Sequence, residues 1–193
     1  MVASTEVCPR SALAARVSDF AASSAIECCL KMPSIYWGKP SSQLVQVNFD
    51  VAIRNSTFVQ AAVLRNHEGV IVSAQAQASH THDPEKAEAE AALMAINLAI
   101  RSRCSHVMFE EDASVIINCF TNLDQTPNWR CYAIIEEARD KLKYFTCWTF
   151  LKVTRFQNRL PHNLASWAYC NQFFGLVPIS SIFHLLSMEN SEN

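Results

Sequence analysis

The chain has 193 residues, of which 50% are hydrophobic and 18% are charged. This length corresponds to about one domain with short additions, and the hydrophobic content excludes a disordered chain. The 16 basic and 18 acidic residues give a net charge of −2, which excludes nucleic-acid binding through overall positive charge. Any contact with nucleic acid must therefore be local.

Glycine and cysteine usage excludes further classes of protein. The three glycines, Gly38, Gly69 and Gly175, are too far apart to form a glycine-rich dinucleotide or phosphate-binding loop. The eight cysteines form no C-x-x-C pair and complete no zinc motif with histidine, so we expect reduced thiols. No run of about 18 apolar residues predicts a membrane span. These features favour the nucleus or cytoplasm over secretion.

We divide the chain into three parts. Residues 1–43 lack a sustained hydrophobic period and end in WGKPSSQ, so we expect a poorly ordered extension and linker. Residues 44–170 contain the regular patterns and form the predicted domain. Residues 171–193 form a tail with the apolar segment FFGLVPISSIFHLL, which we expect to pack on the domain, with a contact to a protein partner as the alternative.

Three strands are predicted at the start of the domain. The segment LVQVNFDVAI, residues 44–53, alternates between apolar and polar residues with the period of a strand, and Asp50 lies inside it. A second strand covers residues 57–65, and a third begins at Val70 after a turn at Gly69. These three strands are expected to form an antiparallel meander.

Helices alternate with two further strands in the rest of the domain. Asp83 is a candidate N-cap and Pro84 suits the first helical position, so a long helix is predicted from there to about Arg103. The remaining predicted elements are a strand at 106–111, helices at 113–121 and 129–144, a strand at 147–155 and a helix at 160–170. This order predicts an α/β fold with a mixed five-stranded sheet, three antiparallel strands followed by two parallel ones, flanked by helices.

Three acidic residues occupy positions where a carboxylate is costly. Because a helix turns by about 100° per residue, Glu88 lies on the packed face of the long helix, whereas Glu90 lies on the opposite, solvated side. Asp50 lies within a strand, and Asp112 lies at the end of one. Each has an ordinary explanation alone: water or an arginine beside Glu88, and an N-cap role for Asp112. Three converging carboxylates would instead repel one another, and Mg²⁺ with oxygen ligands relieves that repulsion.

The chain resembles a known family in five segments that cover about residues 44–170. The segments are LVQVNFDVAI, AAVLRNHEGVIV, DPEKAEAEAALMAINLAI, HVMFEEDASVIINCF and TRFQNRLPHNLASWA. In this order and spacing they resemble the plant ribonuclease H-like domain, the RNase H type-1 fold found in retrotransposon-type reverse transcriptases. The resemblance implies that the predicted mixed sheet is RNase H-like.

The resemblance also implies a site and an activity. The family's metal-binding positions fall on Asp50, Glu88 and Asp112, and its final Asp or His falls on His162. The implied reaction is hydrolysis of the RNA strand of an RNA–DNA hybrid with two Mg²⁺ or Mn²⁺ ions, which Asp50 would bridge. His162 would assist product release or move a proton. The hybrid would be recognised through its 2′-hydroxyl groups and phosphates.

Aromatic and basic residues of the domain could also contact nucleic acid. Trp129, Trp148 and Trp167 could stack on nucleotides, but burial is the stronger expectation at their predicted positions. Three basic residues near the last helix, Arg155, Arg159 and Lys152, could contact phosphates, and a solvated helix edge explains them equally well.

Departures from the family pattern leave other functions open. Val51 replaces a glycine and could crowd the substrate, and Ala61 and Ala62 stand where glycines are common. Glu111 replaces a serine, and strand alternation is expected to turn it away from Asp112. One alternative to a nuclease is a catalytically decayed, transposon-derived domain that binds nucleic acid or a protein. Another is a purely structural α/β interaction module.

Overall fold

The computed structural model of the protein describes residues 44–122 and 126–185, so the predicted extension at 1–43 and residues 186–193 of the tail lie outside the described residues. The described strands are β1 (Val45–Arg54), β2 (Thr57–Arg65), β3 (Ile71–Ser79), β4 (His106–Glu111), β5 (Cys147–Lys152) and β6 (Gly175–Leu176). The described helices are α3 (Pro84–Arg101), α4 (Ser114–Thr121), α5 (Tyr132–Lys141) and α6 (Arg159–Asn171), with short 3-10 turns η1 (Leu142–Tyr144) and η2 (Ile179–Ser181).

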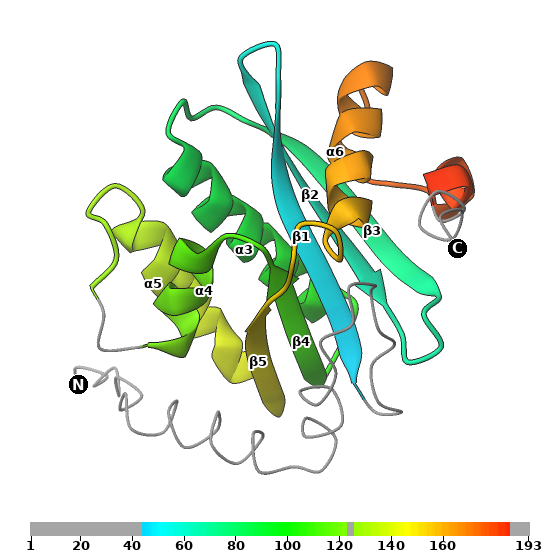
Figure 1. Ribbon diagram of the computed structural model, residues 1–193. Coiled ribbons are helices and arrows are strands. Elements are labelled where there is room, and N and C mark those ends of the chain that lie inside the picture. The colour runs from blue at the N-terminus through cyan, green and yellow to red at the C-terminus, as the bar shows by residue number, and fades with distance from the viewer. Residues whose placement is uncertain (1–43, 123–125, 186–193) are drawn as a thin grey trace, which may run out of the picture.

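The strands form one mixed sheet in the order β5-β4-β1-β2-β3-β6 (Figure 1). Strands β1, β2 and β3 are antiparallel, and β4 and β5 lie parallel to β1, as the sequence predicts. The predicted count of five strands is wrong, because β6 pairs with the edge strand β3 through Ala76 and Gln75. Strand β6 has only two residues and therefore carries no alternation that a sequence pattern could reveal.

The long helix α3 begins where its sequence predicts. The Asp83 carboxylate accepts hydrogen bonds from the backbone N–H groups of Glu85 and Lys86, at 3.1 and 3.4 Å. Pro84 occupies the first helical position, where its missing N–H leaves no hydrogen bond unmade. The chain leaves the helix after Arg101, slightly earlier than predicted, and Arg103 adopts a left-handed conformation with φ of 56°.

Helices cover both faces of the sheet. Helices α3, α4 and α5 pack on one face and α6 packs on the other, as Figure 1 shows. The buried residues of α3 are mostly alanines, whose small side chains let the helix approach the sheet closely. Successive residues of β1 face opposite layers, because Phe49 belongs to the core under α3 and Ala52 to the core under α6. The side chain of Asp50 therefore lies on the α6 face.

The ends of several other elements differ from the sequence prediction. The helix expected at 129–144 is shorter, because α5 ends at Lys141 and continues as the 3-10 turn η1. The strand expected at 147–155 ends at Lys152. In the described part of the tail, Val177, Ile182 and Leu185 are buried in the core under α6.

Two expectations from the sequence, reduced cysteine thiols and no membrane-spanning segment, can be compared with the described residues. Cys104, Cys119, Cys131, Cys147 and Cys170 are free thiols. Within the ranges 44–122 and 126–185, no helix combines the length and the apolar character that a bilayer span requires.

Candidate metal centre

Acidic side chains from two parallel strands meet beside the sheet. Asn48 of β1 is paired with Glu110 of β4, and Asp50 and Asp112 each follow two residues further along the chain. One carboxylate oxygen from each of Asp50, Glu111 and Asp112 lies within 4.8 Å of the other two. Asp50 is only 7% exposed. The fold therefore gathers three carboxylates, of which those of Asp50 and Glu111 are buried and that of Asp112 is half-buried.

Glu88 approaches the same place from α3. Burial and the charges of Asp50 and Asp112 raise the pKa of Glu88 to about 8, against an opposing effect of Arg155. Its Oε2 atom is buried and has no hydrogen-bond partner among the described residues. The three acids predicted from the sequence thus interact electrostatically: Asp50, Glu88 and Asp112. Glu88 is nevertheless not one of the three residues whose carboxylate oxygens lie within 4.8 Å of one another.

Glu111 belongs to this centre, and the expectation that it turns away from Asp112 is wrong. Alternation does direct its side chain to the α3 face, because Val107 and Phe109 of β4 belong to the core there. Glu111 is the last residue of the strand, however, and its Oε1 accepts hydrogen bonds from the N–H groups of Asp112 and Ala113 at 2.8 and 3.2 Å. A long side chain at a strand end can fold back in this way, which alternation at the Cα atoms does not predict.

The electrostatics of the centre favour a cation. Burial raises the pKa of Asp50, although its hydrogen bond to His162 and the electrostatic effect of that residue oppose this shift. Burial also raises the pKa of Glu111 well above its usual value, and the charge of Glu88 adds to the effect. Oε2 of Glu111, like Oε2 of Glu88, is buried without a hydrogen-bond partner in the described part of the chain. Unpartnered carboxylate oxygens in a cluster suit a hard divalent ion such as Mg²⁺.

His162 lies in the first turn of α6 and contacts Asp50. Its Nδ1 atom is 2.8 Å from Oδ2 of Asp50, and its Nε2 atom is 3.3 Å from an Arg54 nitrogen. Because arginine only donates, these partners assign the acceptor role to Nε2 and the N–H to Nδ1, which donates to Asp50. Arg54 also donates to Ser166, one turn further along α6. Arg54 thus links the end of β1 to the histidine, a contact that no sequence pattern indicated.

Asn158 supports the Asp112 side of the centre. This residue precedes α6 and is 1% exposed. Its amide nitrogen donates to the backbone oxygen of Phe49 at 2.7 Å and to Oδ1 of Asp112 at 3.3 Å, and its amide oxygen accepts from Asn48 at 3.3 Å. Sequence reasoning missed Asn158, because an asparagine directly before a helix is ordinarily interpreted as an N-cap. Here its side chain makes no cap hydrogen bond.

The residues that replace family glycines are accommodated within the core. Val51 packs against the core under α3, on the sheet face opposite to the Asp50 side chain. Ala61, which is paired with Asp50, and Ala62 are both fully buried. The side chain of Val51, which the sequence suggested could crowd the substrate, therefore lies on the other sheet face from the Asp50 carboxylate.

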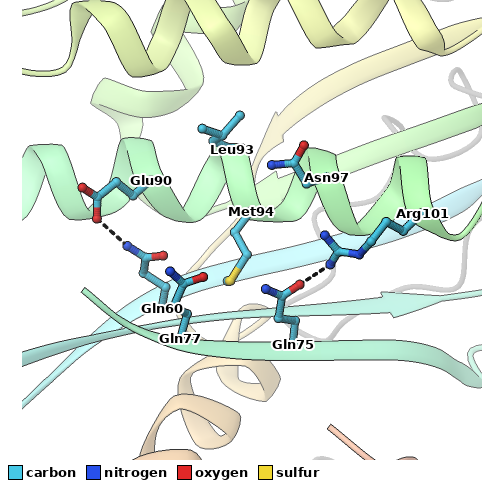
Figure 2. A pocket seen from close by; sticks show the side chains of 8 residues that line it. All are labelled: Gln60, Gln75, Gln77, Glu90, Leu93, Met94, Asn97 and Arg101. Carbon is cyan, nitrogen blue, oxygen red and sulfur yellow. Dashed lines mark hydrogen bonds between the residues drawn. The ribbon is translucent and has the colours of Figure 1, made fainter. Parts of the chain in front are cut away.

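Glu90 lies on another side of α3, in a polar groove of about 310 Å³ between this helix and the strands β2 and β3 (Figure 2). Its Oε2 accepts hydrogen bonds from Gln60 and Ser79, each at 2.7 Å. The expectation of a simply solvated acid is therefore wrong, because the sheet extends past the helix and supplies donors. At the other end of the groove, Arg101 donates to Gln75. The acids of the candidate centre do not line this groove.

The three tryptophans differ in exposure. Trp148 is buried as expected and Trp167 is half-buried, but Trp129 is 81% exposed. The prediction for Trp129 was wrong because α5 begins three residues later, at Tyr132. The guanidinium group of Arg130 lies 5.4 Å from the centre of the Trp129 ring.

A family comparison agrees with this geometry. The reverse transcriptase-like family matches residues 48–168. The chain belongs to this family. The matched interval includes Asp50, Glu88, Glu111, Asp112 and His162. A comparison with curated proteins gave no match.

Solved structures share the fold of this reverse transcriptase-like chain at low sequence identity. RNase H1 of Halobacterium salinarum NRC-1 is 22% identical with a TM-score of 0.61, over 66% of this chain and 98% of that one. The N-terminal RNase H domain of rv2228c from Mycobacterium tuberculosis is 15% identical with a TM-score of 0.60, over 66% and 94%. LC11-RNase H1 from compost, solved with an RNA/DNA hybrid, is 12% identical with a TM-score of 0.57, over 64% and 94%. The predicted RNase H-like fold is thereby confirmed.

Proposed function

We propose that this protein is an endoribonuclease that hydrolyses the RNA strand of RNA–DNA hybrids with divalent cations. The observation that carries the proposal is the convergence of Asp50, Glu88 and Asp112 in an RNase H-like domain, with a buried Glu88 oxygen that lacks a hydrogen bond in the described residues. The RNA/DNA hybrid bound in the LC11-RNase H1 structure supports the same class of substrate.

Asp50, Glu88 and Asp112 are the proposed ligands of Mg²⁺, with Mn²⁺ as an alternative ion. Two bound ions would supply an activated water and stabilise the charge on the leaving oxygen. The protein's own contribution is orientation: Asn158 donates to Asp112, and His162 donates to Asp50. These two hydrogen bonds use Oδ1 of Asp112 and Oδ2 of Asp50, so the other oxygen of each carboxylate is available as a ligand.

His162 is the proposed auxiliary residue. In the neutral tautomer assigned above, Nε2 is the acceptor atom of the ring, and it is the atom through which His162 would move a proton. Arg54 and Ser166 hold the end of β1 against α6 and thereby restrict where the ring lies. His162 would move a proton or assist product release rather than hold the cation.

Contacts to nucleic acid must be local, because the net charge is −2. Trp129 and Arg130 supply an exposed aromatic ring and a cation near the start of α3, where Arg130 is 3.2 Å from the N-cap residue Asp83. Arg155 is also exposed, and its positive charge acts to lower the pKa of Glu88. An exposed ring can stack on a base, and arginines contact phosphates.

The proposal is tested by incubating the full-length protein with a labelled RNA–DNA hybrid in Mg²⁺ or Mn²⁺. The wild type should cleave only the RNA strand, and Asp50→Asn should not cleave it. Glu90→Gln is the matched control, because it removes one acid from the same domain outside the centre. Equal cleavage by wild type and Asp50→Asn, or cleavage by neither, would contradict the proposal.

A catalytically decayed binding domain is the second candidate. The observation that favours it is the engagement of Asp50 Oδ2 by His162, which Arg54 contacts from the other side. A decayed centre should take up no Mg²⁺ in a calorimetric titration, yet the protein should still bind hybrid or a protein partner. Binding of Mg²⁺ without cleavage of any hybrid would indicate a protein that has kept the centre and lost the reaction.

A further inference from the structure

Glu111 has a combination of properties that a structural role does not account for. It is 0% exposed, and its Oε1 accepts two backbone hydrogen bonds at the end of β4. Its Oε2 atom has no hydrogen-bond partner among the described residues. A buried carboxylate oxygen without a partner is costly, because it has lost its water and gained nothing in return.

The position of the carboxylate indicates the missing partner. An oxygen of Glu111 lies within 4.8 Å of an oxygen of Asp50 and an oxygen of Asp112. Ligands on opposite sides of one Mg²⁺ are about 4.2 Å apart, and around the larger Ca²⁺ about 5 Å apart. Small shifts of these side chains therefore suffice for a shared cation. Two arginines lie close to the centre: Arg54 contacts His162 and Ser166, and Arg155 is exposed, although its charge acts on Glu88.

A second buried orphan oxygen lies in the same neighbourhood. Oε2 of Glu88 also lacks a hydrogen-bond partner in the described residues, and the Glu88 charge acts on Glu111. By contrast, the adjacent Glu110 is equally buried but accepts hydrogen bonds from Gln46 and Asn48, the latter at 2.8 Å. Among the described residues, the buried carboxylate oxygens without a partner are thus those of Glu88 and Glu111, and the amide oxygen of Gln46 beside Glu110 is the other buried side-chain oxygen without one.

We propose that Glu111 supplies a fourth carboxylate to the divalent-cation centre, together with Asp50, Glu88 and Asp112. This inference rests on the proposed function, since it extends the same centre. The backbone hydrogen bonds to Oε1 orient the carboxyl group, and Oε2 is the atom that binds the cation. The additional negative charge strengthens the binding of a divalent cation, because affinity at such sites rises with the number of charged ligands.

The test measures cation binding rather than cleavage. Mg²⁺ and Mn²⁺ are titrated calorimetrically into the metal-free, full-length wild type and into Glu111→Gln, Glu111→Ser, Asp112→Asn and Glu90→Gln. Glutamine keeps an oxygen for the N–H groups of Asp112 and Ala113, so that variant should fold; the serine variant removes the whole carboxyl group. Thermal unfolding with and without 5 to 10 mM of each cation, about the range in which weak sites fill, gives a second readout.

The outcomes separate this inference from the proposed function. We expect both Glu111 variants to bind the cations at least about tenfold more weakly and to show a smaller cation-induced rise in Tm, with Glu90→Gln unchanged. Wild-type affinity in Glu111→Gln, with binding lost in Asp112→Asn, would overturn the role of Glu111 and leave the proposed centre intact. It would mean that Glu111 acts as a neutral hydrogen-bonding group. Absence of binding by the wild type would overturn both.

Discussion

Glu88 and Glu90 are two residues apart on α3, yet their surroundings differ completely. Glu90 accepts two hydrogen bonds from Gln60 and Ser79 in the groove of Figure 2. Glu88 faces Asp50 and Asp112 instead, with a buried oxygen that no described residue satisfies. The difference shows that burial alone does not mark a functional acid. A carboxylate with donors is part of the fold, whereas one surrounded by other acids has to hold a proton or share a cation.

The largest expected difference between the two residues is in catalysis. Glu88→Gln should lower the rate of hybrid cleavage at least about 100-fold. Substituting a residue that only orients a metal ligand typically lowers activity by about 10- to 100-fold, and the loss of a ligand itself should cost more. Glu90→Gln should stay within about twofold of the wild type, since small surface-side changes away from a site are nearly neutral. Single-turnover cleavage of a labelled hybrid at saturating Mg²⁺ measures both. Similar losses in the two variants would remove the distinction between them.

The pH dependence of stability should also distinguish the two sides of α3. The pKa of Glu88 is raised from 4.5 to about 8, so the folded state holds a proton that the unfolded state has released. The stability contribution is complete below 4.5 and is lost as the pH rises to about 8. The free energy of unfolding of the metal-free protein should therefore fall over this range, by up to about 1.4 kcal/mol per pH unit for one group.

Urea unfolding at a series of pH values in EDTA measures this effect. Glu88→Gln should flatten the curve, because glutamine does not titrate, and saturating Mg²⁺ should flatten it in the wild type. Glu90→Gln should leave the slope in place. If the free energy of unfolding of Glu88→Gln still falls with pH, another acid holds the proton in the folded state. Glu111 would be the first candidate, because burial raises its pKa as well.

A smaller effect is expected at Trp129, which the sequence analysis expected to be buried. Its ring is 81% exposed, so Trp129→Ala should leave Tm nearly unchanged. If the ring stacks on a nucleotide, the substitution should weaken binding of a non-cleavable hybrid by roughly 5- to 160-fold, the equivalent of about 1 to 3 kcal/mol. Fluorescence anisotropy at fixed salt measures the affinity, with Tyr144→Ala, another exposed aromatic residue, as the control. An equal affinity in Trp129→Ala and wild type would place the interface elsewhere.

Local patterns were sufficient for much of the fold and for part of the centre. Alternation along β1 located Asp50 within a strand, and the Asp83-Pro84 pair located the start of α3. Helical periodicity then distinguished Glu88 from Glu90, because the direction of a side chain from a helix follows from its position in the sequence. These features depend on near neighbours in the chain, which is why the sequence alone could predict them.

The features that were missed depend on contacts between distant segments. Glu111 folds back on its own strand end, and Arg54 meets His162 only because α6 crosses the end of β1. Asn158 contacts Asp112 for the same reason. The length and reach of a side chain decide these contacts, and neither alternation nor helical periodicity contains that information.

The smallest expected effect concerns the donors of Glu90 and tests the comparison from the other side. Ser79→Ala removes one of the two hydrogen bonds to its carboxylate, and Gln60→Ala removes the other. Each substitution should lower the free energy of unfolding by about 1 kcal/mol, since the groove is open to water and the carboxylate can be partly rehydrated. The double variant should lose less stability than the sum of the two single losses if water replaces both donors.

Because cleavage and Mg²⁺ affinity depend on the centre and not on the groove, both should stay at wild-type values in the two single variants and the double variant. A loss of Mg²⁺ affinity in these variants would mean that the groove and the centre are coupled through α3, and the contrast between Glu88 and Glu90 would then describe one site rather than two.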